Sequence, residues 1–225
     1  MWVLLPVKDL RTGKSRLASS LPEHARQSLM AALLADLLGC LQQCETIKGV
    51  LVVTRCPTAT ALAKHHGAET LSTPDDTGLN EAVKVGIETL TRLGIRAAMV
   101  MHADLPMATT SDIDTLVHLH QDSASVVSLV PDNRQDGTNA MLLDLPTAMS
   151  FAYGSGSYPA HLALAKAANL AVQTLHNPHI GSDIDLWDDF QPLFSLSSNT
   201  RQRGHLTHWL EQYGELFEWP QAANH

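Results

Sequence analysis

Strand-like and helix-like segments alternate over the first 130 residues, and this alternation restricts the fold more than any other feature of the chain. Short apolar runs predict buried strands at residues 2–7, 49–54, 69–72, 97–102 and 125–130. Apolar residues at helical spacing predict helices at residues 23–44, 58–66 and 79–93, and a further helix capped by Ser111. Strands joined by helices form a mostly parallel, doubly wound α/β sheet, with the strand-end loops at one edge.

The alternation changes after residue 130. The segment 139–145 is strand-like, but the connection before it is short and has no helix, which predicts one late antiparallel strand. We expect a single domain over residues 1–194 and a C-terminal extension over 195–225. Aromatic residues concentrate in that extension, which fits either a packing arm or a contact in a homodimer. The remaining predicted elements are a helix at 159–168, a strand at 171–175, a short helix at 186–194 and a final helix at 205–217.

Composition excludes several classes of protein. The formal net charge is −8 and only 5% of residues are aromatic, which argues against nucleic acid as a partner. No stretch approaches the ~20 apolar residues that a membrane span needs, and the N-terminal apolar run lacks the features of a secretory signal. The three cysteines predict free thiols rather than a disulfide framework. We therefore expect a cytoplasmic protein that does not contact a membrane.

A cationic loop follows the first predicted strand. Lys8, Lys14 and Arg16 all lie within it. Gly13-Lys14-Ser15 resembles the end of a P-loop, but that motif needs a glycine where this chain has Lys8. A cationic loop at the carboxyl edge of a parallel strand is typical of phosphate binding, here by side chains rather than by a glycine-rich backbone. Ordinary solvated cations are the alternative.

Acidic residues lie in two other loops. Asp104 directly follows a buried strand, whereas Asp183 and Asp185 are two apart in an extended segment and therefore point to the same side. Carboxylates without cysteine or paired histidine favour Mg²⁺, or Mn²⁺, over zinc. The alternative is that these aspartates only cap helices or form turns. Among the histidines, only His102, beside Asp104, is a candidate functional residue.

Small and polar residues mark further loops. The helix that begins at Gly78-Leu79-Asn80 offers backbone N–H groups and an amide that suits a nucleobase or ribose. The loops 136–139 and 151–157 contain glycines and hydroxyl groups but no nucleophile with an evident partner. They suit an acidic or phosphorylated substrate, although a plain linker explains 151–157 equally well.

A cationic phosphate clamp, carboxylates for a divalent cation and an anion pocket together indicate phosphoryl or nucleotidyl transfer. Seven motifs also occur in the order seen in one known family: PVKDLRTGKSRLASSL, VVTR, GLNEAV, HADLP, DGTNAMLL, FAYGSGSYPAH and GSDID. On these motifs, the chain resembles the 2-phospholactate or phosphoenolpyruvate guanylyltransferases of coenzyme F-420 biosynthesis over residues 4–190.

The resemblance implies a nucleotide-diphospho-sugar-transferase-like fold. It also implies an enzyme that couples GMP from GTP to the phosphate of a small three-carbon acid and releases pyrophosphate. The acid would be 2-phospholactate, phosphoenolpyruvate or 3-phosphoglycerate. The implied roles are GTP-phosphate binding by Lys8, Lys14 and Arg16, catalysis by Lys14, Arg16 and Asp104, contact with base and ribose by Gly78, Leu79 and Asn80, Mg²⁺ binding by Asp104, Asp183 and Asp185, and binding of the acid by Thr138, Gly154 and Ser157.

The chain departs from the expected pattern at two places. His102 stands where the resemblance leads us to expect proline or a small residue, and Leu186-Trp187 stands where Thr-Pro is usual. Two other functions fit the same residues. One is a related cytidylyltransferase or molybdopterin guanylyltransferase, and the other is a catalytically silent GTP-binding protein. Competition between GTP and CTP, and release of pyrophosphate, distinguish these alternatives.

Overall fold

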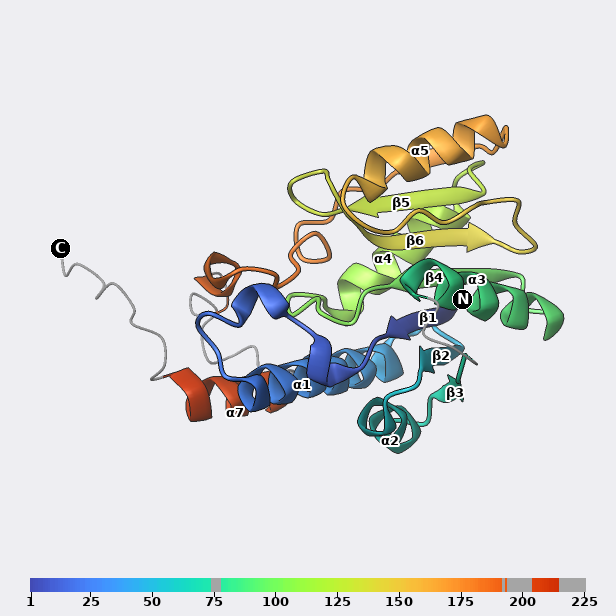
Figure 1. The fold of residues 1–225 in the computed structure, drawn as a ribbon. Helices are drawn as coiled ribbons and strands as arrows, with labels where there is room; N and C mark the ends of the chain where they lie inside the picture. The colour runs from blue at the N-terminus through green and yellow to red at the C-terminus, as the bar shows by residue number, and fades with distance from the viewer. Residues whose placement is uncertain (74–77, 192, 194–203, 215–225) are drawn as a thin grey trace.

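The chain folds around a seven-stranded sheet with the strand order β3-β2-β1-β4-β6-β5-β7 (Figure 1). The computed structural model describes residues 1–73, 78–191, 193 and 204–214. Strand β6 is antiparallel to both of its neighbours, and all other pairs are parallel, which confirms the predicted fold class. The strands are β1 (Trp2–Val7), β2 (Gly49–Thr54), β3 (Glu69–Leu71), β4 (Ala97–Met101), β5 (Val127–Pro131), β6 (Thr138–Asp144) and β7 (Val172–Thr174).

Helices cover both faces of the sheet. Alternate residues of β1 point to opposite faces, so Leu5 packs under α1 while Leu4 packs under α3. Gly86 permits the close approach of α3, because a Cβ atom there would lie 2.1 Å from a methyl group of Leu4. The helices are α1 (Glu23–Gln43), α2 (Pro57–His65), α3 (Gly78–Arg92), α4 (Thr110–Gln121), α5 (Ser157–Ala167) and α7 (Gly204–Tyr213), with short 3-10 turns η1 (Leu10–Thr12), η2 (Ser15–Leu17) and η3 (Trp187–Phe190).

The prediction that Ser111 caps α4 is wrong. Thr109 is the N-cap, and its side chain and that of Asp112 form a reciprocal capping box. Ser111 already lies inside the first turn of the helix. Asp114 accepts hydrogen bonds from the backbone N–H groups of Glu45 and Thr46, and so joins α4 to the end of α1.

The C-terminal helix packs along α1 within the same chain (Figure 1). The indole Nε1 of Trp209 donates to the carbonyl of Ala25 and the hydroxyl of Ser28, both at 3.0 Å. Trp209 is buried in one apolar cluster with residues of α1 and with Phe190. This contact fits a packing arm, and the homodimer contact stays a prediction. The segment expected to be a helix at 186–194 contains the 3-10 turn η3. The predicted residues 215–217 of the last helix lie outside the described residues.

Two further expectations can be compared with the described part of the chain. The cysteines at 40, 44 and 56 are all free thiols. Within the described ranges, no helix has the length and apolar character needed to span a membrane.

Candidate active site

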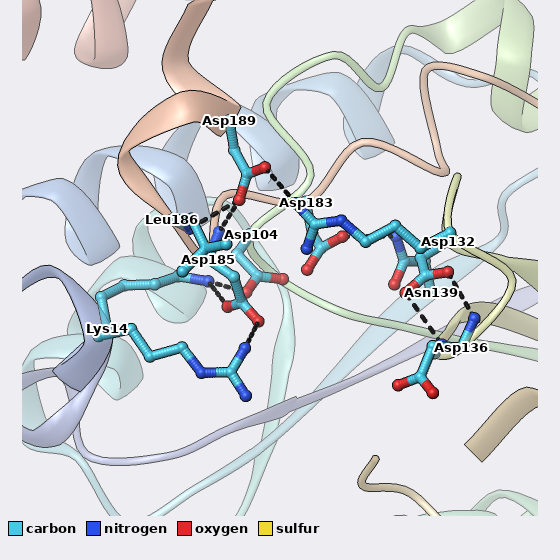
Figure 2. Close-up of polar contacts among 12 residues, drawn as sticks. Lys14, Asp104, Asp132, Asp136, Asn139, Asp183, Asp185, Leu186 and Asp189 are labelled. Carbon is cyan, nitrogen blue, oxygen red and sulfur yellow. Dashed lines mark hydrogen bonds and ion pairs between the residues drawn. The ribbon is translucent and has the colours of Figure 1, made fainter. Parts of the chain in front are cut away.

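A buried lysine connects the cationic loop to the predicted acidic residues (Figure 2). The ammonium group of Lys14 contacts the carboxylate of Asp104 and lies 3.0 Å from Oδ1 of Asp185. Arg16 reaches the other oxygen of Asp185 at 3.3 Å. These side chains come from the loop after β1, the loop after β4 and the segment before η3. The structure therefore brings together four charged residues that were predicted to lie in loops at one edge of the sheet.

The loop after β1 is shaped to aim Lys14 inward. Lys14 has a left-handed backbone conformation, with φ of 54° and ψ of 44°, between the turns η1 and η2. A non-glycine residue rarely adopts this conformation. The side chain is buried, whereas Lys8 and Arg16 of the same loop are exposed. One cation of the predicted clamp is thus inside the site and the other two are at its rim.

The charges of this cluster stabilise one another. Burial alone would raise the pKa of Asp104, but the nearby charges of Lys14 and His102 hold that pKa below its ordinary value. Burial likewise opposes the charged form of Lys14, but Asp104 and Asp185 raise its pKa. Asp104 and Lys14 are therefore both charged at neutral pH.

Asp183 has the opposite electrostatic environment. Burial raises its pKa, and the nearby negative charge of Asp104 raises it further. Asn139 opposes this shift, because its amide donates to Oδ1 of Asp183 at 3.3 Å as well as to the carbonyl of Ile180. A region with excess negative charge next to Asp104 is therefore favourable for an additional cation.

The donor set fits Mg²⁺ in chemistry but is not assembled as a metal site. Oδ1 of Asp104 is buried and has no hydrogen-bond partner, so it can accept a ligand. Both oxygens of Asp185, however, are paired with Lys14 and Arg16. Within the part of the chain that the structure describes, no three Asp, Glu, His or Cys side chains are arranged to hold one ion. Ligation by Asp183 and Asp185 stays a prediction, and it requires Asp185 to release its cations.

Two adjoining cavities lie on this edge of the sheet. Lys14, Asp104 and His102 line the smaller one, of about 270 Å³. The larger one, of about 770 Å³, extends toward Gly78. Lys8 and Leu79 line both cavities. No role was predicted for two further cations of the larger cavity, Arg11 and Arg55, although Arg55 directly follows a strand.

The amide of Asn80 is already occupied in this structure. Its Nδ2 donates to the carbonyl of Tyr153 at 3.2 Å, and its Oδ1 accepts from the N–H of Tyr153 at 2.6 Å. Asn80 thus attaches the loop 151–157 to the start of α3. Contact between Asn80 and a base or ribose stays a prediction.

Thr138 and Ser157 lie together, but they are buried and bind each other. The N–H of Thr138 donates to Oγ of Ser157 at 2.9 Å. The carbonyl of Gly154 accepts a hydrogen bond from the N–H of Ser157 at 3.1 Å. Gly154 is exposed and has a φ of 142°, which favours glycine. Binding of the acid by these residues stays a prediction.

His161, for which no role was predicted, connects these loops. Its Nε2 accepts from the N–H of Ala152 at 2.9 Å, so the ring proton must be on Nδ1, which lies 2.9 Å from Oγ1 of Thr138. Burial, with a smaller effect of His102, lowers the pKa of His161 to about 4. His161 is therefore a neutral imidazole of one tautomer that fixes the 151–157 loop.

Asp189 holds the acidic segment in place (Figure 2). Its Oδ2 accepts from the N–H groups of Asp185 and Leu186, at 2.8 and 2.6 Å, and its Oδ1 pairs with Arg134 at 2.8 Å. Arg134 comes from the loop between β5 and β6. No role was predicted for Asp189, and the only sequence signal was an acidic residue four positions after Asp185.

The sequence of the chain is similar to those of known nucleotide-transferring enzymes. Residues 1–210 match the family described as "Guanylyl transferase CofC like". The chain is similar to the phosphoenolpyruvate guanylyltransferases of Conexibacter woesei, at 34% identity over 200 residues (89% of this chain and 90% of that protein), and of Sphaerobacter thermophilus, at 34% over 190 residues (84% and 90%).

Solved structures resemble the chain in fold. A putative nucleotide-diphospho-sugar transferase from Desulfovibrio desulfuricans G20 has a TM-score of 0.75 at 14% identity, covering 96% of this chain and 95% of that one. A cytidylyltransferase from Leptospira borgpetersenii has a TM-score of 0.60 at 12% identity, covering 99% and 98%. At such identities the similarity concerns the fold alone, and it confirms the expected nucleotide-diphospho-sugar-transferase-like architecture.

Proposed function

The chain belongs to the CofC-like guanylyl transferase family, and from this membership we propose that it transfers GMP from GTP to phosphoenolpyruvate in the biosynthesis of coenzyme F-420. The observation that supports this acceptor is 34% identity, over most of the chain, to two proteins named phosphoenolpyruvate guanylyltransferase. 2-Phospholactate and 3-phosphoglycerate are the other acceptors to be compared. The cytoplasmic location expected from the sequence is part of this proposal, and so is the homodimer that the sequence offered as one of two alternatives.

The reaction balances without a protein base. An oxygen of the acceptor phosphate attacks the α-phosphorus of GTP, and the bond from that phosphorus to the bridging oxygen of the β-phosphate breaks. Pyrophosphate leaves with that electron pair. The attacking phosphate is already an anion, so no proton has to be removed from it. What the chain must supply is positive charge for the leaving group and correct positioning.

The cationic loop supports this role. Lys8 lines both cavities, so it can contact phosphates of a nucleotide that occupies the larger one. Lys14 and Arg16 would turn from Asp185 toward the phosphates when these arrive, because the ligand offers them more negative charge. Base and ribose would then lie toward Gly78 and Leu79, in a cavity whose volume of about 770 Å³ is sufficient for a nucleotide.

The carboxylates would hold Mg²⁺. Asp104 offers its unpartnered Oδ1, and Asp183 and Asp185 lie beside it. When bound, the ion would neutralise charge on the reacting phosphates. Asp185 would become available as Lys14 and Arg16 move to the nucleotide, so nucleotide and metal would each favour binding of the other.

The test is release of pyrophosphate from GTP and Mg²⁺ in the presence of each of the three acids, with the product identified by mass. Release with phosphoenolpyruvate alone is the expected result. Release from CTP instead of GTP would identify a cytidylyltransferase. Binding of GTP without release of pyrophosphate from any acid would overturn the proposal in favour of a silent nucleotide-binding protein.

A further inference from the structure

Asp112, in the first turn of α4, does more than cap its own helix. Its pairing with Thr109 forms the capping box. In addition, its Oδ1 accepts from Nδ2 of Asn177 and its Oδ2 lies near Nδ1 of His179, both at 2.9 Å. These two further partners belong to the loop between β7 and η3. Asp112, whose side chain is only 15% exposed, therefore joins α4 to the loop that carries the predicted acidic pair.

The loop after β7 is folded around Asn177. The side-chain oxygen of Asn177 accepts from the backbone N–H groups of His179 and Ile180, at 3.0 and 2.9 Å. The carbonyl of Asn177 accepts from the N–H of Gly181 at 2.8 Å. Ile180 is fully buried in the apolar core. Asp112 therefore holds a compact turn whose position determines where the residues after it lie.

A second contact attaches the same loop nearer to the reacting edge. The N–H of Ile184 donates to the carbonyl of Asp104 at 3.3 Å. Asp104 and Asp112 both lie on the segment that leads from β4 into α4, so the two contacts join the same two parts of the chain. Attachment at two points fixes the orientation of the loop between them, and that stretch contains Asp183.

This attachment opposes a repulsion. Besides burial, the negative charge of Asp104 raises the pKa of Asp183, so the two carboxylates disfavour each other in the charged form. Without a cation between them, the repulsion favours separation of the two segments, and the hydrogen bonds of Asp112 hold them together. A site that is held in place before its ligand arrives binds that ligand at a lower cost in conformational entropy.

We propose that Asp112 is a positioning residue for the divalent cation, because it keeps Asp183 within reach of Asp104. An ion that arrives with the nucleotide phosphates would then contact both carboxylates without rearrangement of the loop. This inference rests on the proposed function, from which it takes the nucleotide and the ion. Asp112 itself lines neither of the two cavities and acts only through the loop that it holds.

The test is Asp112→Asn, which removes the charge and one acceptor but keeps the shape of the side chain. Asp114→Asn is the matched control, because Asp114 lies on the same helix and also accepts hydrogen bonds from a neighbouring segment, but from Glu45 and Thr46 at the end of α1. Calorimetry would measure the binding of a GTP analogue that resists cleavage between the α- and β-phosphates, with and without Mg²⁺.

We expect Mg²⁺ to strengthen binding of the analogue to the wild type and to Asp114→Asn. In Asp112→Asn this gain in affinity should be about 10-fold smaller, as is usual when a residue that orients metal ligands is lost. Binding without Mg²⁺ should be the same in all three proteins. The urea midpoints of the two variants should lie close together, which excludes loss of fold. Equal gains in the two variants would refute the inference.

A second substitution distinguishes positioning from helix capping. Asn177→Asp, added to Asp112→Asn, restores a hydrogen bond between the two positions with donor and acceptor exchanged. The double variant should therefore recover part of the gain from Mg²⁺, although it does not restore the original cap of α4. No recovery would reduce Asp112 to a helix cap and refute the inference.

The binding measurement needs no turnover, so the inference and the proposed function can fail separately. A reduced gain in Asp112→Asn, together with no release of pyrophosphate by the wild type with any acid, would support the inference and refute the proposed transfer. Release with phosphoenolpyruvate, together with equal gains in Asp112→Asn and Asp114→Asn, would do the reverse. No effect of Mg²⁺ on binding by the wild type would refute the inference whatever the turnover.

Discussion

Breaking the ion pair between Lys14 and Asp104 should lower the free energy of unfolding strongly. The side chain of Lys14 is only 4% exposed and that of Asp104 is 16% exposed. Removing one partner of a buried ion pair leaves the other charge without compensation, which costs about 3–5 kcal/mol. Lys14→Met should therefore lower the free energy of unfolding by about 3 kcal/mol. Asp104→Asn should cost less, because Lys14 keeps Asp185 at 3.0 Å.

The double variant makes the argument quantitative. Lys14→Met combined with Asp104→Asn removes both charges, so the cost of an uncompensated carboxylate disappears. We expect its destabilisation to be smaller than the sum of the single variants by about 1–3 kcal/mol. All three proteins should lack turnover, because Lys14 and Asp104 are both proposed to act on the substrates. Lys84→Met, which removes an exposed lysine 3.7 Å from Glu81, is the control and should change stability by less than about 0.5 kcal/mol.

The assay is urea denaturation of the metal-free proteins at pH 7 and at lower pH. The pKa of Asp104 is depressed in the folded state, so its contribution is full above the ordinary value of 3.8 and is lost as the pH falls through the lower folded value. The deficit of Lys14→Met should therefore shrink in acid. Additive costs of the two substitutions, with a deficit that does not depend on pH, would refute the reasoning.

Three further predictions follow from the positioning residues. Trp209→Phe loses both hydrogen bonds of the indole and should lower the free energy of unfolding by about 2 kcal/mol in urea denaturation; an unchanged midpoint would show that these two hydrogen bonds do not stabilise the packing of α7 on α1. Asp189→Asn should lower kcat about 10- to 100-fold with little change in the KM for GTP, and Arg134→Met should have a smaller effect of the same kind; equal losses in the two variants would contradict the arrangement. His161 has a folded pKa of about 4 against an ordinary 6.5, so its contribution is full above pH 6.5 and should decrease by about 3 kcal/mol as the pH falls through 4. Urea midpoints against pH should be flatter in His161→Gln than in the wild type, and parallel curves would contradict the assignment.

The fold was predictable because its signals are local. Apolar runs and helical spacing depend on residues that are close in the sequence. The alternation of strands and helices and the late antiparallel strand β6 could therefore be predicted. The cap of α4 was not resolved, because Thr109 and Ser111 both suit an N-cap and the choice depends on where the helix begins.

The sequence predicted at which edge of the sheet the site lies, but not which side chains contact each other there. The strand-end rule placed Lys14 and Asp104 there, but their contact joins residues 90 positions apart. A lysine facing phosphates and a lysine facing carboxylates look the same in sequence. His161 had no signal, and Asp189 had only its spacing from Asp185, because their partners include backbone N–H groups, which every residue but proline possesses.

The packing of α7 on α1 has a consequence for how the protein is made. The cationic loop precedes α1, yet Lys14 meets its partners only at residues 104 and 185. The part of α1 around Ala25 and Ser28 receives its cover only from Trp209. Residues 1–17 are thus synthesised long before the segments that complete their surroundings. A nascent chain interrupted before α7 would have formed most of the sheet, but it would expose the apolar face of α1 beside an incompletely supported site.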